Sequence, residues 1–257
     1  MELLKFDSVD ISYGDQVAVR GVSFSLCERE ILALVGESGS GKSTIVRAAV
    51  RLPGCGKVTR GRILFRGRDI TSLDEREMRG VRGARIAMAF QDAASSFCPV
   101  RTIGDQLYES LAAHGKVRKS DVKMHALEAF SKIGLDEAVW NSYPFELSGG
   151  MCARVGIAVA MLPRPDVLLA DEPTAALDTV SKHEVVAEIL RLRERLGTSA
   201  VIVTHDFSVA RHADRIVVLK DGEIVESGAT CEVMGTPASD YTRRLLAAMP
   251  RLRRREP

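Results

Sequence analysis

A continuous apolar run that leads directly into a glycine-rich loop constrains the fold of this chain more than any other feature. Residues 31–35 read Ile-Leu-Ala-Leu-Val, and such a run predicts a strand buried on both faces. A helix is predicted from Ser43 to Arg51, and Pro53-Gly54 ends it. The loop between this strand and this helix consists of Gly36, Glu37, Ser38, Gly39, Ser40, Gly41, Lys42, Ser43 and Thr44.

The residue types in this loop suit the binding of phosphate groups. Gly36, Gly39 and Gly41 let the backbone wrap closely, so that consecutive N–H groups point inward. The N-terminus of the following helix adds a partial positive charge. Lys42 is expected to reach the β- and γ-phosphates of a nucleoside triphosphate, and the Ser43 hydroxyl is expected to ligate Mg²⁺.

Strands and helices alternate along most of the chain. The first thirty residues alternate apolar and polar positions around turn signals, which predicts antiparallel strands. Further strands are predicted at residues 63–65, 86–90, 167–170, 200–204 and 215–219. Strand-helix-strand alternation implies a mostly parallel sheet, so the predicted fold class is α/β. Residues 102–160 carry helical patterns only, which predicts an inserted helical segment.

Two further elements are predicted in the second half. Asp221-Gly222 is typical of a hairpin turn, and residues 241–249 predict a closing helix. An amphipathic helix is expected between the strands at 167–170 and 200–204. Its apolar side would carry Val185, Val186, Ile189, Leu190 and Leu196, and its polar side Glu184, Glu188, Arg191 and Glu194.

Candidate catalytic residues follow three of the predicted strands. Asp171 and Glu172 end the run at 167–170, where Asp171 could hold Mg²⁺ and Glu172 could polarise an attacking water. Two adjacent carboxylates are costly unless a cation lies nearby. His205 could hydrogen-bond the γ-phosphate, and Gln91 could sense the γ-phosphate or Mg²⁺. A structural histidine and a helix-capping aspartate are the alternative interpretations.

A second glycine turn lies far downstream, at residues 147–151, which read Leu-Ser-Gly-Gly-Met. Together with the loop at 36–44, it indicates one nucleotide site built from two pieces. A single chain need not bring the two pieces together.

These motifs, in this order, resemble the ATP-binding subunit of ATP-binding cassette (ABC) transporters. The resemblance extends from Tyr13 through the two glycine motifs and the segment Ala176-Leu177-Asp178 to His205, which is almost the whole chain. It implies one domain over residues 1–257. In that domain 1–100 and 161–257 form the P-loop core with an N-terminal antiparallel β subdomain, and 101–160 form the helical subdomain.

The resemblance also implies roles for single residues. Tyr13 is expected to stack on adenine, although a buried strand tyrosine is the alternative. Ser148, Gly149 and Gly150 are expected to contact the γ-phosphate of an ATP held by the opposite subunit. Asp178 is expected at the seam between two subunits, and Glu172 is expected to be the catalytic base. Gln91 would couple the site to membrane subunits through the segment after it.

A narrower resemblance is to importers of peptides, nickel and metal chelates. Residues 144–151 carry methionine after the two glycines, and Tyr241-Thr242-Arg243-Arg244-Leu245-Leu246 before Pro250 resembles the closing helix of that group. Cys152 departs from the pattern, and is expected to be a small buried residue. The lack of a cysteine-bearing tail after Pro257 favours nickel or a metallophore. The implied partners are a second cassette in a heterodimer, two permease subunits and an extracytoplasmic solute-binding protein.

Composition limits the other partners. The formal net charge of +2 gives no reason to expect nucleic acid. The apolar stretch at 156–162 is far shorter than the roughly 20 residues that cross a bilayer. Charged residues interrupt the apolar ones at the start, so no secretory signal is predicted. Five cysteines without a Cys-x-x-Cys pair indicate reduced thiols. We therefore expect the chain at the cytoplasmic face of the membrane, held there by permeases.

Three other function classes share the phosphate loop and compete with this interpretation. An exporter subunit would carry the same motifs. A soluble cassette protein in translation or DNA repair would be expected to carry two cassettes or nucleic-acid-binding insertions. A GTPase would need Asn-Lys-x-Asp, and the only asparagine is Asn141.

Overall fold

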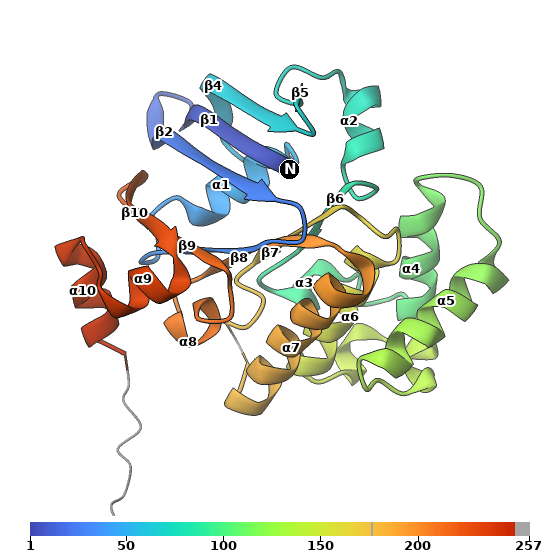
Figure 1. Ribbon diagram of the computed structural model, residues 1–257. Helices are drawn as coiled ribbons and strands as arrows, with labels where there is room; N and C mark the ends of the chain where they lie inside the picture. The colour runs from blue at the N-terminus through green and yellow to red at the C-terminus, as the bar shows by residue number, and fades with distance from the viewer. Residues whose placement is uncertain (176, 250–257) are drawn as a thin grey trace, which may run out of the picture.

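The computed structural model describes residues 1–175 and 177–249. Two β-sheets lie one above the other, and helices surround the larger one (Figure 1). Three positions quoted above, Ala176, Pro250 and Pro257, lie outside the described residues.

The smaller sheet is the predicted antiparallel one. Its strand order is β2-β1-β4-β5, and β1 pairs with both β2 and β4 in antiparallel register. The Phe6 and Phe24 rings stack across β1 and β2 with centroids 4.5 Å apart. Its strands are β1 (Glu2–Tyr13), β2 (Gln16–Cys27), β4 (Lys57–Phe65) and β5 (Arg68–Asp69).

The larger sheet has the order β10-β9-β3-β8-β7-β6. All of its pairs are parallel except β10 with β9, which the turn at Asp221-Gly222 joins as a hairpin. This arrangement confirms the α/β class. Its strands are β3 (Ile31–Val35), β6 (Ile86–Ala89), β7 (Val167–Asp171), β8 (Ser199–Thr204), β9 (Arg215–Lys220) and β10 (Glu223–Ala229).

The buried strands divide their side chains between two cores. Leu32 and Leu34 of β3 join the cluster between the two sheets, where α1 (Lys42–Ala49) also packs. Ile31, Ala33 and Val35 join the cluster on the opposite face. There the sheet is covered by α6 (Gly149–Met161), α7 (Thr179–Leu196), α8 (Phe207–Ala210), α9 (Thr230–Gly235) and α10 (Asp240–Ala247). The continuous apolar runs thus correspond to strands buried on both faces.

The segment after β6 is helical, as expected, and has a core of its own. Phe130, Trp140 and Val155 are among the residues of this third cluster. The N-terminal half of the chain also contains α2 (Glu75–Val81) and the short α3 (Ala93–Ser96). The helical segment itself contains α4 (Ile103–Ala112), α5 (Lys119–Lys132), and the short 3-10 helices η1 (Glu137–Asn141) and η2 (Pro144–Glu146). In Figure 1, α4 and α5 lie on the opposite side of the molecule from α10.

The amphipathic pattern predicted for α7 is wrong at two positions. Glu188, expected on the polar side, is only 4% exposed, and its carboxylate accepts a hydrogen bond from Arg191 at 3.3 Å. Leu196, expected on the apolar side, is 45% exposed at the last position of the helix. The reason is that α7 packs against α6 as well as against the sheet, which buries part of its polar side.

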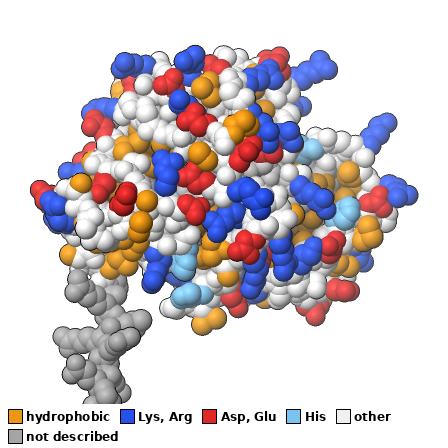
Figure 2. All heavy atoms as spheres, in the orientation of Figure 1, with side chains coloured by type: hydrophobic (Ala, Val, Ile, Leu, Met, Phe, Trp, Pro, Cys, Tyr) orange, Lys and Arg blue, Asp and Glu red, His pale blue; other side chains and the backbone are white. Residues whose placement is uncertain are grey.

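The surface carries charges of both signs. Lys and Arg side chains gather near the middle of the face in Figure 2, with Asp and Glu side chains between them. Within the described residues, no helix combines the length and apolarity required to span a bilayer.

Candidate functional site

The glycine-rich loop wraps around the side chain of its own lysine. Lys42 is 4% exposed, and its Nζ donates to the carbonyl oxygens of Gly36 at 2.9 Å and Glu37 at 2.7 Å. Gly41 has a φ of 98°, a left-handed conformation that favours glycine, and a Cβ there would lie 3.2 Å from the Ala18 carbonyl oxygen. Burial lowers the pKa of Lys42, and the Glu172 carboxylate acts in the opposite direction.

The loop leaves donors free for an anion. Within the described loop, the backbone N–H groups of six residues donate to no carbonyl oxygen. These residues are Ser38, Gly39, Gly41, Lys42, Ser43 and Thr44. The buried Ser40 hydroxyl also has no partner among the described residues. Free N–H groups at the start of a helix form an anion site, so the loop fits the phosphates of a nucleotide.

A pocket of about 630 Å³ opens in front of these donors. Besides the loop, Gln91, Glu172 and His205 line it. The structure therefore brings into one pocket the phosphate loop, Gln91, Glu172 and His205, which lie far apart in the sequence. Ala175 and Leu245, which the sequence analysis did not select, also line the pocket.

Asp171 is fully buried at the end of β7 and has two partners. The Ser43 hydroxyl donates to its Oδ1 at 2.6 Å, and Arg47 Nε donates to its Oδ2 at 3.0 Å. A second nitrogen of the Arg47 guanidinium lies 2.9 Å from the same oxygen. Arg47 is therefore the cation beside the paired carboxylates. The sequence analysis missed it, although its place four residues after Ser43 puts both on one face of α1.

Glu172 and His205 form a direct pair across neighbouring strands. His205 Nδ1 lies 3.0 Å from Glu172 Oε2, and the Glu172 N–H donates to the Val203 carbonyl at 3.0 Å. Glu172 adopts a φ of 46°. A left-handed conformation costs a non-glycine residue about 1–3 kcal/mol, and such strain is common at functional sites. The strained backbone holds the carboxylate facing the loop.

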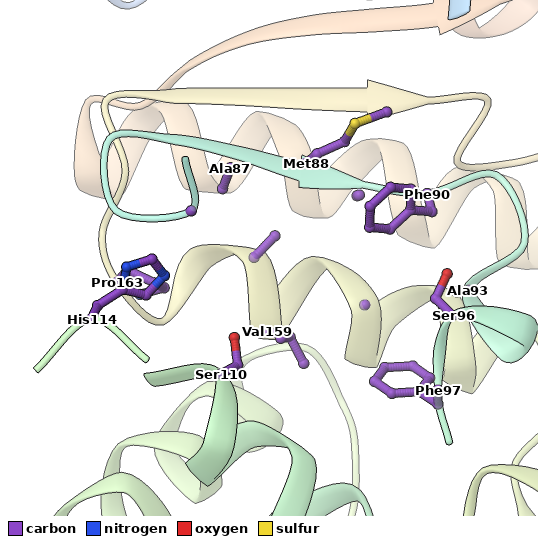
Figure 3. Close-up of a pocket in the computed structure, with 14 residues that line it drawn as sticks. Ala87, Met88, Phe90, Ala93, Ser96, Phe97, Ser110, His114, Val159 and Pro163 are labelled. Atoms are coloured by element: carbon purple, nitrogen blue, oxygen red, sulfur yellow. The ribbon is translucent and has the colours of Figure 1, made fainter. Parts of the chain in front are cut away.

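Gln91 is exposed and follows β6 at the junction with the helical segment. A smaller cavity of about 210 Å³ lies beside this junction. Figure 3 shows Phe90 and Phe97 at one end of this cavity and His114 with Pro163 at the other. The segment after Gln91 thus connects the loop pocket to the seam between the sheet and the helices.

Tyr13 does not lie in the core of its sheet. Its side chain is 42% exposed, and its hydroxyl lies 3.2 Å from the Thr44 hydroxyl of the loop. The interpretation as a buried strand residue is therefore wrong. An exposed ring beside the loop is free to contact a base.

The second glycine turn lies outside the loop pocket. Ser148 caps the N-terminus of α6, and its hydroxyl accepts from the Met151 N–H at 3.2 Å. Gly150 packs against Ser181, because a Cβ on Gly150 would lie 2.8 Å from the Ser181 hydroxyl. Asp178 begins α7 and accepts from the Ser181 hydroxyl at 2.7 Å, a contact that holds the pKa of Asp178 below its usual value. Ser148 and Gly149 are exposed, and neither lines the pocket in front of the loop.

Comparison with known proteins agrees with this geometry. The sequence profile described as "ABC transporter" matches residues 19–175. The chain belongs to the ABC transporter family. As an ABC ATPase, it binds ATP and hydrolyses it.

The Cys152 side chain is buried, as the sequence analysis expected.

Its relatives in this family include proteins named for peptide transport. The dipeptide transport ATP-binding protein DppD of Bacillus subtilis is 41% identical over 247 residues, which are 94% of this chain and 74% of that protein. The oligopeptide transport ATP-binding protein OppD of the same organism is 43% identical over 249 residues, covering 94% and 69%. Among solved structures, the ABC cassette MJ0796, described as dimeric and bound to ADP and Pi, has a TM-score of 0.80 and 31% identity. That match covers 89% of this chain and 99% of MJ0796.

Proposed function

We propose that this chain is the energy-coupling ATPase subunit of a peptide importer. One observation carries the proposal. The phosphate loop, Gln91, Glu172 and His205 share one pocket, whereas the turn at Ser148 lies outside it. In this proposal the pocket supplies half of the machinery for one ATP, and the turn at Ser148 serves an ATP held elsewhere.

Each residue of the pocket has a proposed task. The free N–H groups of the loop and Lys42 bind the phosphates, and the exposed Tyr13 ring contacts adenine. Mg²⁺, when bound, neutralises charge on the β- and γ-phosphate oxygens. The Ser43 hydroxyl, the Asp171 carboxylate and the Gln91 amide oxygen would hold it, since Mg²⁺ prefers oxygen ligands.

Glu172 is proposed as the general base. The Glu172 side chain lines the loop pocket, and its Oε2 lies 3.0 Å from His205 Nδ1. His205 is proposed to orient this carboxylate; its side chain is 58% exposed and lines the loop pocket. A carboxylate within reach of a water in line with that phosphate removes the proton of the attacking water.

The turn at Ser148 implies a second subunit. We propose that Ser148, Gly149 and Gly150 contact the ATP of a partner cassette and that Asp178 lies at the seam between the two. The packing of Gly150 on Ser181 supports this, because it joins the turn to the start of α7. In the same proposal, residues 101–160 form a helical subdomain and residues 1–100 and 161–257 form the core, with the division following the separate third cluster.

The names of the relatives favour peptides over nickel or metallophores as the solute. DppD, OppD and the glutathione import protein GsiA of Escherichia coli O157:H7, 42% identical, are all named for peptides. We propose a heterodimer with a related cassette, bound to two permease subunits at the cytoplasmic face of the membrane. An extracytoplasmic solute-binding protein would deliver the peptide. The membrane subunits would contact the segment after Gln91.

Replacing Glu172 with glutamine tests the assignment of the base. Glu172→Gln should lower ATP turnover by about 100-fold or more, because general-base catalysis contributes about 10²–10⁴-fold. ATP binding should persist, since the loop is intact. Glu194→Gln, an exposed glutamate on α7, is the matched control and should keep full turnover. An unchanged rate in Glu172→Gln would show that another group is the base.

A further inference from the structure

The closing helix α10 contacts the phosphate loop through one side chain. Tyr241 is 7% exposed, and the Glu37 N–H donates to its hydroxyl oxygen at 3.2 Å. Burial raises the pKa of Tyr241, so the phenol stays neutral at physiological pH. The two residues are 204 positions apart in the chain. This hydrogen bond therefore links the C-terminal part of the fold directly to the loop.

The Tyr241 side chain is held in place by its surroundings. Lys220 Nζ lies 5.6 Å from the centroid of the ring. Glu226 on β10 accepts from the Ala238 N–H at 2.7 Å and from the Ser239 N–H at 3.1 Å, which directs the chain into α10. Ser239 then caps the helix by accepting from the Tyr241 N–H at 3.2 Å. The hydroxyl is thus presented to the loop from a fixed position.

The Glu37 peptide is held by partners at both of its polar atoms. Its carbonyl accepts from the Ser40 N–H at 3.2 Å and from Lys42 Nζ at 2.7 Å, while its N–H donates to Tyr241. The preceding Gly36 rests on β9, because a Cβ there would lie 2.3 Å from the Leu219 carbonyl oxygen. Once this entry to the loop is fixed, the loop has little freedom to turn its remaining N–H groups away from the pocket.

We propose that Tyr241 is a positioning residue for nucleotide binding, acting through the Glu37 peptide to hold the loop ready for phosphate. The inference rests on the proposed ATP site, and it assigns a task to the closing helix that the proposed function leaves open. Holding the loop in its bound form lowers the cost of binding, because less freedom is lost when the phosphates arrive. Leu245, one turn after Tyr241, lines the same pocket and places α10 at its wall.

The first test compares Tyr241→Phe with the wild-type chain. The variant keeps the packed ring and removes only the hydroxyl. We expect the Kd for an N-methylanthraniloyl ATP analogue and the KM for ATP to rise about fivefold, the effect of one hydrogen bond, with kcat unchanged. Tyr108→Phe is the matched control, because the half-buried Tyr108 hydroxyl makes no hydrogen bond within the described residues. An unchanged Kd in a folded Tyr241→Phe variant overturns the proposal.

The second test removes the other partner of the same bond. Glu37→Pro lacks the N–H that donates to Tyr241. We expect Glu37→Pro to weaken binding of the analogue, and Tyr241→Phe to add no further loss on that background, since the two changes remove one interaction. Losses that multiply contradict the proposal. If the wild-type chain itself does not bind the analogue, the proposed function is wrong, and the role of Tyr241 is then wrong as well. Normal binding by the wild-type chain with an unchanged Kd in Tyr241→Phe overturns only the role of Tyr241.

Discussion

Replacing Arg47 with alanine should destabilise the folded protein in the absence of nucleotide. Asp171 is fully buried, and its two partners are the Ser43 hydroxyl and the Arg47 guanidinium. The variant leaves a buried carboxylate with one neutral donor. Nothing in the local sequence around Asp171 would predict this loss, since the two residues are 124 positions apart.

The size of the loss follows from the exposure of each partner. Removing one member of a fully buried ion pair costs about 3–5 kcal/mol, whereas an exposed pair contributes about 0–1 kcal/mol. The Arg47 side chain is 41% exposed and Asp171 is 0% exposed, so an intermediate value applies. We expect a loss of about 2 kcal/mol, close to that of hydrogen bonds to a charged group. At about 2–4 °C per kcal/mol for a chain of this size, the Tm should fall by about 4–8 °C.

Thermal unfolding followed by circular dichroism in EDTA measures this directly. Arg62→Ala is the matched control, because Arg62 pairs with Asp7 at 3.3 Å while both side chains are well exposed, 61% and 40%. Its Tm should change by less than about 2 °C. With ADP and Mg²⁺ added, the loss in Arg47→Ala should shrink, since a cation then lies beside Asp171 again. An Arg47→Ala variant that unfolds at the wild-type temperature would refute the reasoning.

Four further substitutions, one of them a control, test other parts of the structure. Tyr13→Ala should raise the KM for ATP about tenfold, because stacking on a base contributes about 1–3 kcal/mol; an unchanged KM would leave the ring a structural one. Ser148→Arg, assembled with the partner cassette, should reduce trapping of labelled nucleotide on the partner and spare this chain, and the reverse result would contradict the shared site. Gly104→Ala should lower the Tm, since its Cβ would lie 2.4 Å from the Trp140 ring and such overpacking costs about 1–3 kcal/mol. Gly80→Ala in α2 meets open space and should raise the Tm slightly, so equal effects of the two glycine changes would refute the packing argument.

Several expectations from the sequence depend only on neighbouring residues, and these agree with the structure. The run at 31–35 is a strand buried on both faces, and the helix after the loop begins at Lys42 and ends at Ala49, two residues before the predicted end. The closing helix spans Asp240–Ala247 where 241–249 was expected. Apolar periodicity and turn residues act over a few positions, which is why they can be interpreted without the fold.

Other features depend on contacts between distant segments, and the sequence analysis missed them or got them wrong. The burial of Glu188 arises where α7 meets α6, a contact that the amphipathic pattern of α7 alone does not contain. The exposure of Tyr13 arises from its place at the end of β1 beside the loop.

The sequence by itself determined the α/β class, the phosphate loop and the chemistry of its residues, because a strand, a glycine-rich turn and a helix start form one continuous segment. Only the tertiary structure decided which distant groups hold that loop: Arg47 on Asp171, and Tyr241 on Glu37. It also decided that the turn at Ser148 does not line the loop pocket. The physical reason is that a side chain's partner across a sheet is set by strand order and helix packing, and these are properties of the whole fold.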